Sequence, residues 1–323
     1  MATAELELVA EAVLPPDQQL GPINPVELGR ASGLTFASAA EPEILAPLLG
    51  QLSCALALFV ESESEAAFSL HPLTETLVYG TELATTQRYR GKTNERLTRA
   101  MLNMALAAAG LSPAGPWQRR PLVLDPMCGR GTTLNWALAY GLDAVGIEPD
   151  SSALGHHDVF LKTWAKRNRL PHNHQSHRAK NAEKRHSSLT VAPSRQAQKQ
   201  GESHRVQTFK ADGGDRSLPI KKGTVDLIVC DLPYGIHHES NPGALDPSDT
   251  VDLVVRMAPS WRRWLRRGGS MALAWNVRRA TRADLARVLL EAGFHQPNRG
   301  EGPSMEHFVD SSITRDVIVV VAP

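Results

Sequence analysis

The segment Val225-Asp-Leu-Ile-Val-Cys-Asp-Leu-Pro-Tyr-Gly235 constrains the fold more than any other part of the chain. Leu227 to Cys230 form a short continuous apolar run with β-branched members, which is typical of a parallel strand covered on both faces. The strand is predicted to stop at Asp231. Open α/β sheets place their chemistry in the loop after the carboxyl end of such a strand, so we expect a functional loop there.

The residues of this loop suit the binding of a planar ring that carries an N–H donor. Asp231 offers only hydrogen-bond acceptors, and Pro233 stiffens the backbone. Tyr234 offers a flat ring, and Gly235 permits a tight turn.

A second motif, Pro121-Leu-Val-Leu-Asp-Pro-Met-Cys-Gly-Arg-Gly-Thr-Thr-Leu134, predicts a strand that ends at Asp125, a glycine loop and a helix. Gly129 and Gly131 allow the backbone to approach a ligand closely, as in dinucleotide sites. The spacing matches neither GxGxxG nor a phosphate-binding GK[ST]. The loop is therefore predicted to hold a nucleoside without a pyrophosphate.

An acid follows the next predicted strand, Ala144 to Ile147. This residue, Glu148, comes 23 residues after Asp125. An acid at the end of the second strand can accept hydrogen bonds from both ribose hydroxyls. Asp212 follows a third predicted strand, 206–210, where it could meet an adenine amino group.

Helical and strand patterns alternate through the rest of the chain. The expected helices are 89–109 (with Thr93 or Asn94 as N-cap), 151–169, 250–267 and 283–292, and the further strands are 270–275 and 316–321, with an antiparallel partner around Phe308. Such alternation predicts a Rossmann-like, mostly parallel sheet with an antiparallel carboxyl-terminal edge.

The net charge of +1 conceals a division between two regions. Residues 1–87 contain twelve acidic residues and one basic residue, Arg30, whereas residues 88–323 contain 34 basic and 22 acidic residues. We expect an acidic amino-terminal accessory region, 1–87, and a basic domain, 88–323, that binds a polyanion.

The segment 170–205 breaks the alternation. It holds seven Lys or Arg, two Asp or Glu and five His among many Gln, Ser and Asn residues. With little to bury, it is predicted to be a basic, disordered insertion. Its histidines have no acid or cysteine at ligand spacing, so a solvated loop is favoured over a metal site, and contact with nucleic acid is a further option.

Two other basic clusters have two interpretations each. In the first, Arg90, Lys92 and Arg96 form a solvated helix start, or Lys92 and Thr93 lie beside a bound cofactor. Four arginines of the predicted helix 250–267 form either its solvated outer face or a phosphate-binding ridge. These are Arg262, Arg263, Arg266 and Arg267.

The cysteines and the apolar runs indicate a compartment. Cys54, Cys128 and Cys230 are widely spaced and include no CxxC pair, which argues against a disulfide framework or zinc site and favours a reducing cytoplasm. No apolar run approaches the ~18–20 residues of a membrane span. The first fifteen residues carry glutamates rather than the basic start of a signal peptide.

Together the two motifs, about a hundred residues apart, resemble those of the class I S-adenosylmethionine (SAM) methyltransferases. Within that class, the (Asn/Asp)-Pro-Pro-(Tyr/Phe) group methylates amines, and the present motifs look similar to those of the tRNA guanine-N2 methyltransferases usually found behind a THUMP domain. The resemblance covers roughly 88–323. Leu232 stands where the family commonly has proline, and residues 1–87 show no THUMP pattern.

The resemblance implies a role for each matching residue. Asp231 and the Leu232 carbonyl would accept hydrogens from an exocyclic base amine, next to Pro233, while Tyr234 stacks on the base. Because Leu232 would act through its carbonyl, its side chain is expected to be replaceable. The implied SAM-binding residues are Asp125, Pro126, Cys128, Gly129, Gly131, Thr132, Glu148 (ribose) and Asp212 (adenine).

The implied function is SAM-dependent methylation of an exocyclic amine in RNA, most simply guanine N2 in tRNA, without a metal. A DNA adenine or cytosine amino-methyltransferase is the second enzyme hypothesis. A non-catalytic SAM- or RNA-binding protein is the third, and the intact Asp231 and Tyr234 count against it.

Overall fold

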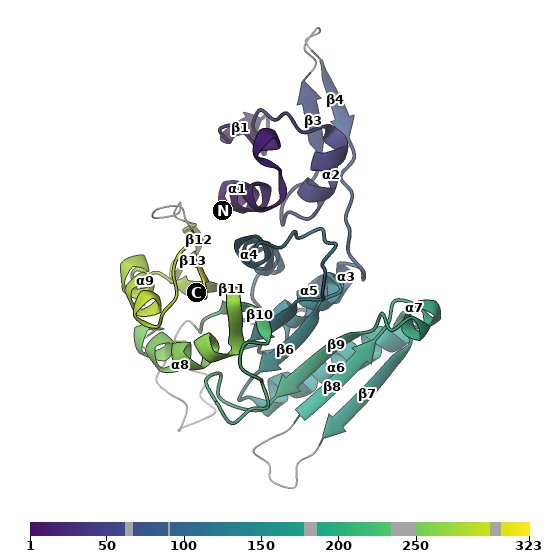
Figure 1. Cartoon of the computed structure of the whole chain (residues 1–323), viewed down its shortest axis with the longest axis vertical. Helices are drawn as coiled ribbons and strands as arrows, with labels where there is room; N and C mark the ends of the chain where they lie inside the picture. The colour runs from purple at the N-terminus through teal and green to yellow at the C-terminus, as the bar shows by residue number, and fades with distance from the viewer. Residues whose placement is uncertain (62–66, 90, 178–185, 234–249, 298–304) are drawn as a thin grey trace.

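The computed structural model describes residues 1–61, 67–89, 91–177, 186–233, 250–297 and 305–323. Within these ranges, the central sheet has nine strands in the order β12-β13-β11-β10-β5-β6-β9-β8-β7 (Figure 1). Two small hairpins, β1–β2 and β3–β4, belong to the amino-terminal region.

Five neighbouring strands of the central sheet are parallel. They are β5 (Leu122–Asp125), β6 (Asp143–Ile147), β9 (His204–Phe209), β10 (Val225–Asp231) and β11 (Leu265–Asn276). Parallel strands place their carboxyl ends at one edge of the sheet. The predicted Rossmann-like sheet is confirmed, and it brings the ends of β5, β6, β9 and β10 together.

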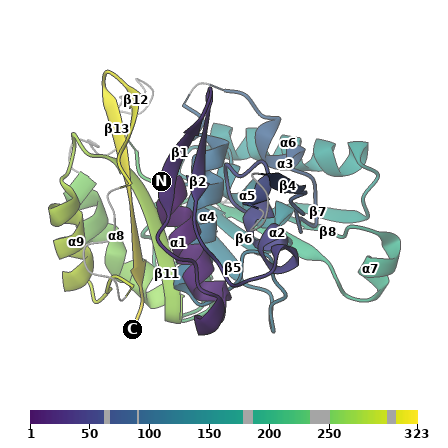
Figure 2. The same cartoon turned by 90° about the horizontal axis from the view of Figure 1, so that it is seen from above.

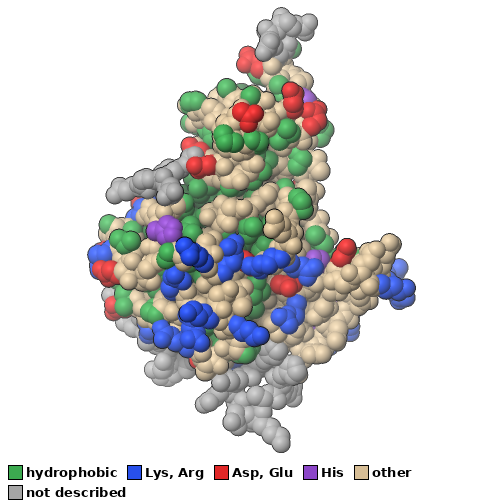
Figure 3. Space-filling model, in the orientation of Figure 1, with side chains coloured by type: hydrophobic (Ala, Val, Ile, Leu, Met, Phe, Trp, Pro, Cys, Tyr) green, Lys and Arg blue, Asp and Glu red, His purple; other side chains and the backbone are tan. Residues whose placement is uncertain are grey.

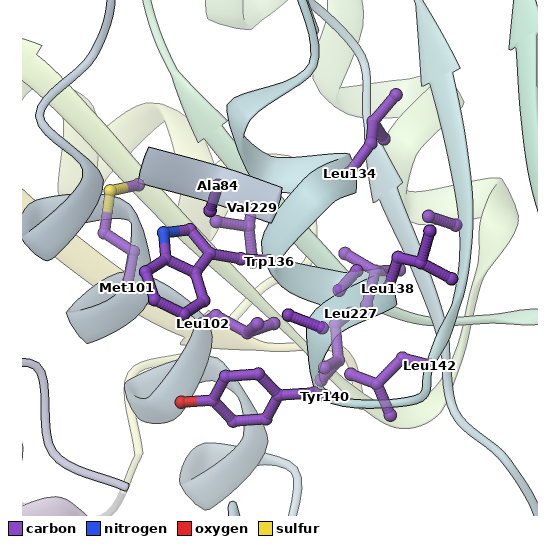
Figure 4. Close-up of a cluster of buried hydrophobic side chains, with 14 of the residues drawn as sticks. Ala84, Met101, Leu102, Leu134, Trp136, Leu138, Tyr140, Leu142, Leu227 and Val229 are labelled. Atoms are coloured by element: carbon purple, nitrogen blue, oxygen red, sulfur yellow. The ribbon is translucent and has the colours of Figure 1, made fainter. Parts of the chain in front are cut away.

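The strand β10 is buried on both faces, as its continuous apolar run predicts. Leu227 and Val229 lie in one hydrophobic cluster, which Figure 4 shows, and Ile228 and Cys230 lie in another. Alternate side chains of a strand point to opposite faces. Both faces of the sheet are therefore covered around this strand.

Helices form a layer on each side of the sheet (Figure 2). One layer contains α3 (Glu82–Thr85), α4 (Glu95–Ala108), α5 (Thr132–Ala139) and α6 (Ser151–Arg167), and the other contains α8 (Thr250–Trp264) and α9 (Arg282–Glu291). Asn94 caps α4 by accepting from the Arg96 and Leu97 amides, as expected. The helix predicted to reach residue 267 ends instead at Trp264, because Leu265 already begins β11.

The carboxyl-terminal edge is an antiparallel hairpin, as predicted. β13 (Ile313–Val321) pairs antiparallel with β11, and β12 (His307–Asp310) pairs antiparallel with β13.

The prediction of disorder for 170–205 is wrong for the residues that the structure describes. β7 (His172–His177) and β8 (His186–Val191) extend the sheet as an antiparallel hairpin beside β9, and α7 (Arg195–Lys199) follows. Leu189 and Val191 are buried, while Thr190 between them is only half-buried. Backbone pairing with β9 thus orders a segment that has little apolar surface to bury. Residues 178–185 lie outside the described part of the chain.

The amino-terminal region has a small apolar cluster of its own. Its elements are α1 (Ala2–Val13), the 3-10 turn Pro16–Gln18, β1 (Asn24–Leu28), β2 (Ala31–Thr35), α2 (Pro42–Gly50), β3 (Leu58–Glu61) and β4 (Phe68–His71). Glu5 of α1 is fully buried and accepts from the Asn103 amide of α4 at 2.6 Å and from the Ser53 hydroxyl at 2.6 Å. Burial raises the pKa of this carboxyl. A buried polar network therefore joins this region to α4.

In the described ranges, no helix is long and apolar enough to cross a membrane.

Candidate active site

The strand β10 delivers Asp231 to the carboxyl edge of the sheet, where residues from two distant segments contact its carboxylate. The Thr93 hydroxyl donates to Asp231 Oδ2 at 2.7 Å, and Arg315 Nη2 of β13 lies 3.6 Å from the same oxygen. The Asp231 side chain is 12% exposed and that of Arg315 is 8% exposed. The carboxylate is thus held in one orientation in a largely water-free position.

The residues after Asp231 differ in burial. The Leu232 amide donates to the Ala274 carbonyl at 2.8 Å, which continues the pairing with β11. The Leu232 side chain is completely buried in the cluster beneath α8 and α9, whereas Pro233 is exposed. The Leu232 side chain is therefore part of the core, which argues against its being freely replaceable. Tyr234 lies outside the described residues.

A tight loop, residues 126–131, joins β5 to α5. Gly129 (φ 49°) and Gly131 (φ 81°) have left-handed backbone conformations that favour glycine. A Cβ on Gly131 would overlap the imidazole of His157 in α6, but a Cβ on Gly129 would meet no described atom within 4 Å. Gly131 is therefore packed from behind, and Gly129 faces space into which a ligand can come.

Contacts with neighbouring strand ends fix this loop. The Cys128 amide donates to the Ile147 carbonyl at 3.0 Å, and the buried Cys128 thiol has a raised pKa because of burial. The Pro126 carbonyl is so close to Gly213 that a side chain at Gly213 would overlap it. The loop consequently lies against the ends of both β6 and β9.

The acid that follows β6, Glu148, accepts hydrogen bonds from two backbone amides, one in the glycine loop and one just after Glu148 itself. Its Oε2 accepts from the Gly129 amide at 2.9 Å, and its Oε1 accepts from the Asp150 amide at 2.9 Å. Burial raises the pKa of Glu148. Glu148 therefore lies beside the glycine loop.

Asp125 is the most perturbed acid at this edge. Burial, with smaller contributions from Glu148 and Asp231, raises the pKa of Asp125 to about 7, although the Met127 amide donates to its Oδ1 at 3.1 Å. Three carboxyl groups from neighbouring strand ends therefore influence one another. This arrangement favours a ligand that carries positive charge.

Asp212 differs from these three acids because its carboxylate is paired with an arginine of α8. Its side chain is 45% exposed, and its Oδ2 pairs with Arg256 Nη1 at 3.0 Å. The close approach of Gly213 to Pro126 brings Asp212 near the loop, but its carboxylate already has a partner from α8.

A match to a known family identifies the kind of protein that carries these acids and this glycine loop. The sequence model of a family described as the RMKL-like methyltransferase domain matches residues 90–284. The chain belongs to the RMKL-like methyltransferase family. A comparison with curated protein sequences gave no match.

Several solved structures resemble this methyltransferase distantly. TrmN from Thermus thermophilus is 19% identical, with 75% of this chain and 52% of TrmN covered and a TM-score of 0.42. An S-adenosylmethionine-dependent methyltransferase from Clostridium acetobutylicum is 9% identical, with 72% of this chain and 94% of that chain covered and a TM-score of 0.43. The chain thus spans about half the length of TrmN.

The two motifs predicted SAM as the cofactor, and the residues present at these strand ends fit it. SAM carries a sulfonium and an ammonium group. The raised pKa of Asp125, caused first by burial and then by the neighbouring acids, shows that added positive charge would be stabilised there. The open side of Gly129 offers room for the nucleoside beside Glu148.

Several residues of this candidate site had no recognisable sequence signal. Arg315 lies in an apolar strand without a motif, and His157 lies in an ordinary helix. Burial lowers the pKa of His157 to about 4, so it packs behind Gly131 as a neutral ring. Arg130 of the glycine loop stacks on Tyr89, 4.7 Å from the ring centroid.

Thr93 and Lys92 are neighbours in the sequence but have different contacts. Thr93 contacts the site through Asp231. The Lys92 ammonium instead donates to the Ala84 and Gln87 carbonyls at 3.0 and 2.8 Å, and it pairs with Glu95. These three contacts of Lys92 stabilise the turn before α4. Thr93, in contrast, contacts one of the acids at the strand ends, Asp231.

The methyltransferase is expected to release protons when it binds a cationic nucleoside. The folded-state pKa of Asp125, about 7, lies above the ordinary aspartate pKa of 3.8, so its contribution to stability is full below about pH 4 and is lost as pH rises through 7. A bound cation should lower this pKa. At pH 7, sinefungin, whose amine replaces the sulfonium, should release roughly half a proton.

Isothermal titration calorimetry in phosphate and in Tris measures this release, because the two buffers take up protons with different heats. S-adenosylhomocysteine, which lacks the sulfonium charge, should release less, and Asp125→Asn should abolish the difference between ligands. Equal heats for sinefungin in both buffers would contradict this account of Asp125.

Proposed function

We propose that the chain is a SAM-dependent RNA methyltransferase that modifies an exocyclic base amine, most specifically guanine N2 in tRNA. The observation that carries this proposal is the largely buried Asp231 carboxylate, held at the carboxyl end of β10 near the acids at the ends of β5 and β6. When ionised, this carboxylate accepts hydrogen bonds and cannot donate them, which suits an amine as the target.

We assign cofactor binding to residues around the ends of β5, β6 and β9. These are Asp125, Pro126, Cys128, Gly129, Gly131, Thr132, Glu148 and Asp212. Bound SAM supplies an electrophilic methyl group. Glu148 would exchange one of its backbone hydrogen bonds for the ribose hydroxyls, and Asp212 would need to share its carboxylate between Arg256 and the adenine.

The target amine is a poor nucleophile, because its lone pair is delocalised into the base. Asp231 and the Leu232 carbonyl can each accept one of its hydrogens and draw the nitrogen towards tetrahedral geometry. The carboxylate then stabilises the positive charge that develops on the nitrogen. Thr93 and Arg315 contribute by fixing the carboxylate, so that much of the rate arises from positioning.

We further propose that Pro233 keeps the loop rigid and that Tyr234 stacks on the base. A base in a folded RNA must be extruded from its stack to reach this loop. The excess of 34 basic over 22 acidic residues in 88–323 supports an anionic macromolecular substrate. We regard 1–87 as an accessory region, and the free cysteines Cys54, Cys128 and Cys230 support a place in the cytoplasm.

Deleting the gene and digesting total tRNA to nucleosides tests the proposal. Mass spectrometry should show the loss of one N2-methylguanosine, and a plasmid copy should restore it. Restoration should fail with a copy that carries Asp231→Asn. Unchanged methylguanosine together with a loss of N6-methyladenine or N4-methylcytosine from DNA would overturn the RNA assignment.

A further inference from the structure

A row of basic side chains lies along the amino ends of the parallel strands, opposite the edge that holds Asp231. The row precedes or begins the strands β5, β10 and β11. Its central members are Arg119, Lys221, Lys222, Arg263, Arg266 and Arg267. On the face that Figure 3 shows, Lys and Arg side chains gather below the amino-terminal region, whose charged side chains visible there are acidic.

Direct contacts establish that these residues are neighbours. Arg119 Nη2 and Arg266 Nε both lie 2.5 Å from Asp226 Oδ1, and the Gly223 amide donates to the Arg263 carbonyl at 3.0 Å. Asp226 is buried, whereas the Arg119 side chain is 59% exposed. One acid therefore orients two arginines and neutralises only one of their charges.

The row continues across the next two strands. Arg120 pairs with Asp143, the first residue of β6, and Arg205 is exposed near the start of β9. The strands β11, β10, β5, β6 and β9 are consecutive in the sheet. With about 4.8 Å between strands, the row is roughly 19 Å long.

The charge, composition and length of the row fit a nucleic-acid backbone. Double-stranded DNA carries about one charge per 1.7 Å of axis, so a row of roughly 19 Å would face the phosphates of about five or six of its base pairs. An A-form RNA duplex has a shorter rise per base pair, so it presents at least as many phosphates along this length. Arginine dominates the row, and its planar guanidinium binds phosphate through paired hydrogen bonds. Guanidinium groups fixed by Asp226 lose less freedom on binding than free ones would.

We propose that this basic amino edge binds the phosphate backbone of a folded RNA whose target base reaches Asp231 at the opposite edge. The inference rests on the proposed RNA substrate and narrows it. β10 spans Val225–Asp231, about 20 Å for seven residues. A short single strand bound at Asp231 does not extend to the basic amino edge, but an RNA with helical arms does.

The test variant replaces four exposed members of the row with Lys221→Gln, Lys222→Gln, Arg263→Gln and Arg267→Gln. It leaves the Asp226 network intact. The matched control removes the same charges from α6 and α7 with Lys162→Gln, Lys166→Gln, Arg167→Gln and Arg195→Gln, all exposed. Thermal melting confirms that both variants fold.

Filter binding to unfractionated tRNA over a range of salt concentrations gives the primary readout. The test variant should weaken tRNA binding about tenfold or more, and the dependence of log Kd on log salt should fall by about 3. The control variant should bind within about twofold of the unmodified protein. Transfer of methyl to a short single-stranded oligonucleotide should be unaffected, and kcat at saturating tRNA should be retained.

Three outcomes overturn the inference: unchanged tRNA affinity in the test variant, an equal loss in the control, or a dimer that dissociates in the test variant while tRNA affinity persists. The third would mean that the basic amino edge binds the acidic region of a second copy. A fourth outcome is also distinguishable: the unmodified protein binds tRNA in a salt-dependent way that the test variant loses, yet it methylates no RNA. That result would support the basic amino edge as an RNA-binding surface and would refute only the proposed function.

Discussion

Asp231→Asn is expected to lower kcat for tRNA methylation by about 10²- to 10³-fold, the range for losing one preorganised electrostatic contact to a transition state. Asparagine keeps the shape of the side chain but replaces one acceptor oxygen with an N–H donor. That donor would face either the amine hydrogens or the Thr93 hydroxyl, which lies 2.7 Å from Oδ2. It also removes the negative charge that stabilises the developing cation. Single-turnover transfer of a labelled methyl group measures the effect.

Cofactor affinity separates a chemical role from a structural one. The dissociation constant for S-adenosylhomocysteine, which lacks the sulfonium charge, should change little in Asp231→Asn, because the glycine loop and Glu148 are left intact. Thr93→Val should cost about tenfold in kcat by freeing the carboxylate, and Thr93→Ser should retain most of the rate. Activity of Asp231→Asn within threefold of the unmodified enzyme would contradict the assignment.

Gly131→Ala is expected to destabilise the protein by about 2–5 kcal/mol. The left-handed backbone costs a non-glycine residue roughly 1–2 kcal/mol, and overpacking typically adds about 1–3 kcal/mol. The added Cβ would overlap the His157 ring, which is 1% exposed and hydrogen-bonded to Asn135 at 3.1 Å. The ring therefore has little freedom to move. Urea denaturation measures the change in the free energy of unfolding.

Gly129→Ala is the matched control in the same loop. Its φ is also positive, but its Cβ would enter open space, so only the backbone cost of about 1–2 kcal/mol applies. Removing the ring with His157→Ala should recover part of the cost of Gly131→Ala in a double-mutant cycle. Equal destabilisation by the two glycine substitutions, with no coupling to His157, would contradict this packing.

The sheet was predictable from sequence because its central strands have strong local patterns. β10 is buried on both faces, and its continuous apolar run reports this directly. The hairpin β7–β8 was missed because its stability comes from backbone pairing with β9, and its polar side chains resemble those of a disordered segment. The alternation of Leu189 and Val191 with polar residues was the available signal.

The candidate site was predictable where its residues follow strands. Asp125, Glu148 and Asp231 converge because parallel strands end at one edge. Arg315 was not predictable, because it meets Asp231 through the antiparallel strand β13, whose register no local pattern gives. The burial of Leu232 depends likewise on the helices α8 and α9, which close over it from later in the chain.

The position of the transferred methyl group tests whether the enzyme methylates an exocyclic base nitrogen with the help of Asp231. Unmodified tRNA would be incubated with the purified enzyme and SAM bearing a labelled methyl, then digested to nucleosides for mass spectrometry. The label is expected on an exocyclic nitrogen, as N2-methylguanosine, and is expected to be absent with Asp231→Asn. Label on a ribose oxygen or a base carbon, or equal labelling by both proteins, would contradict this expectation.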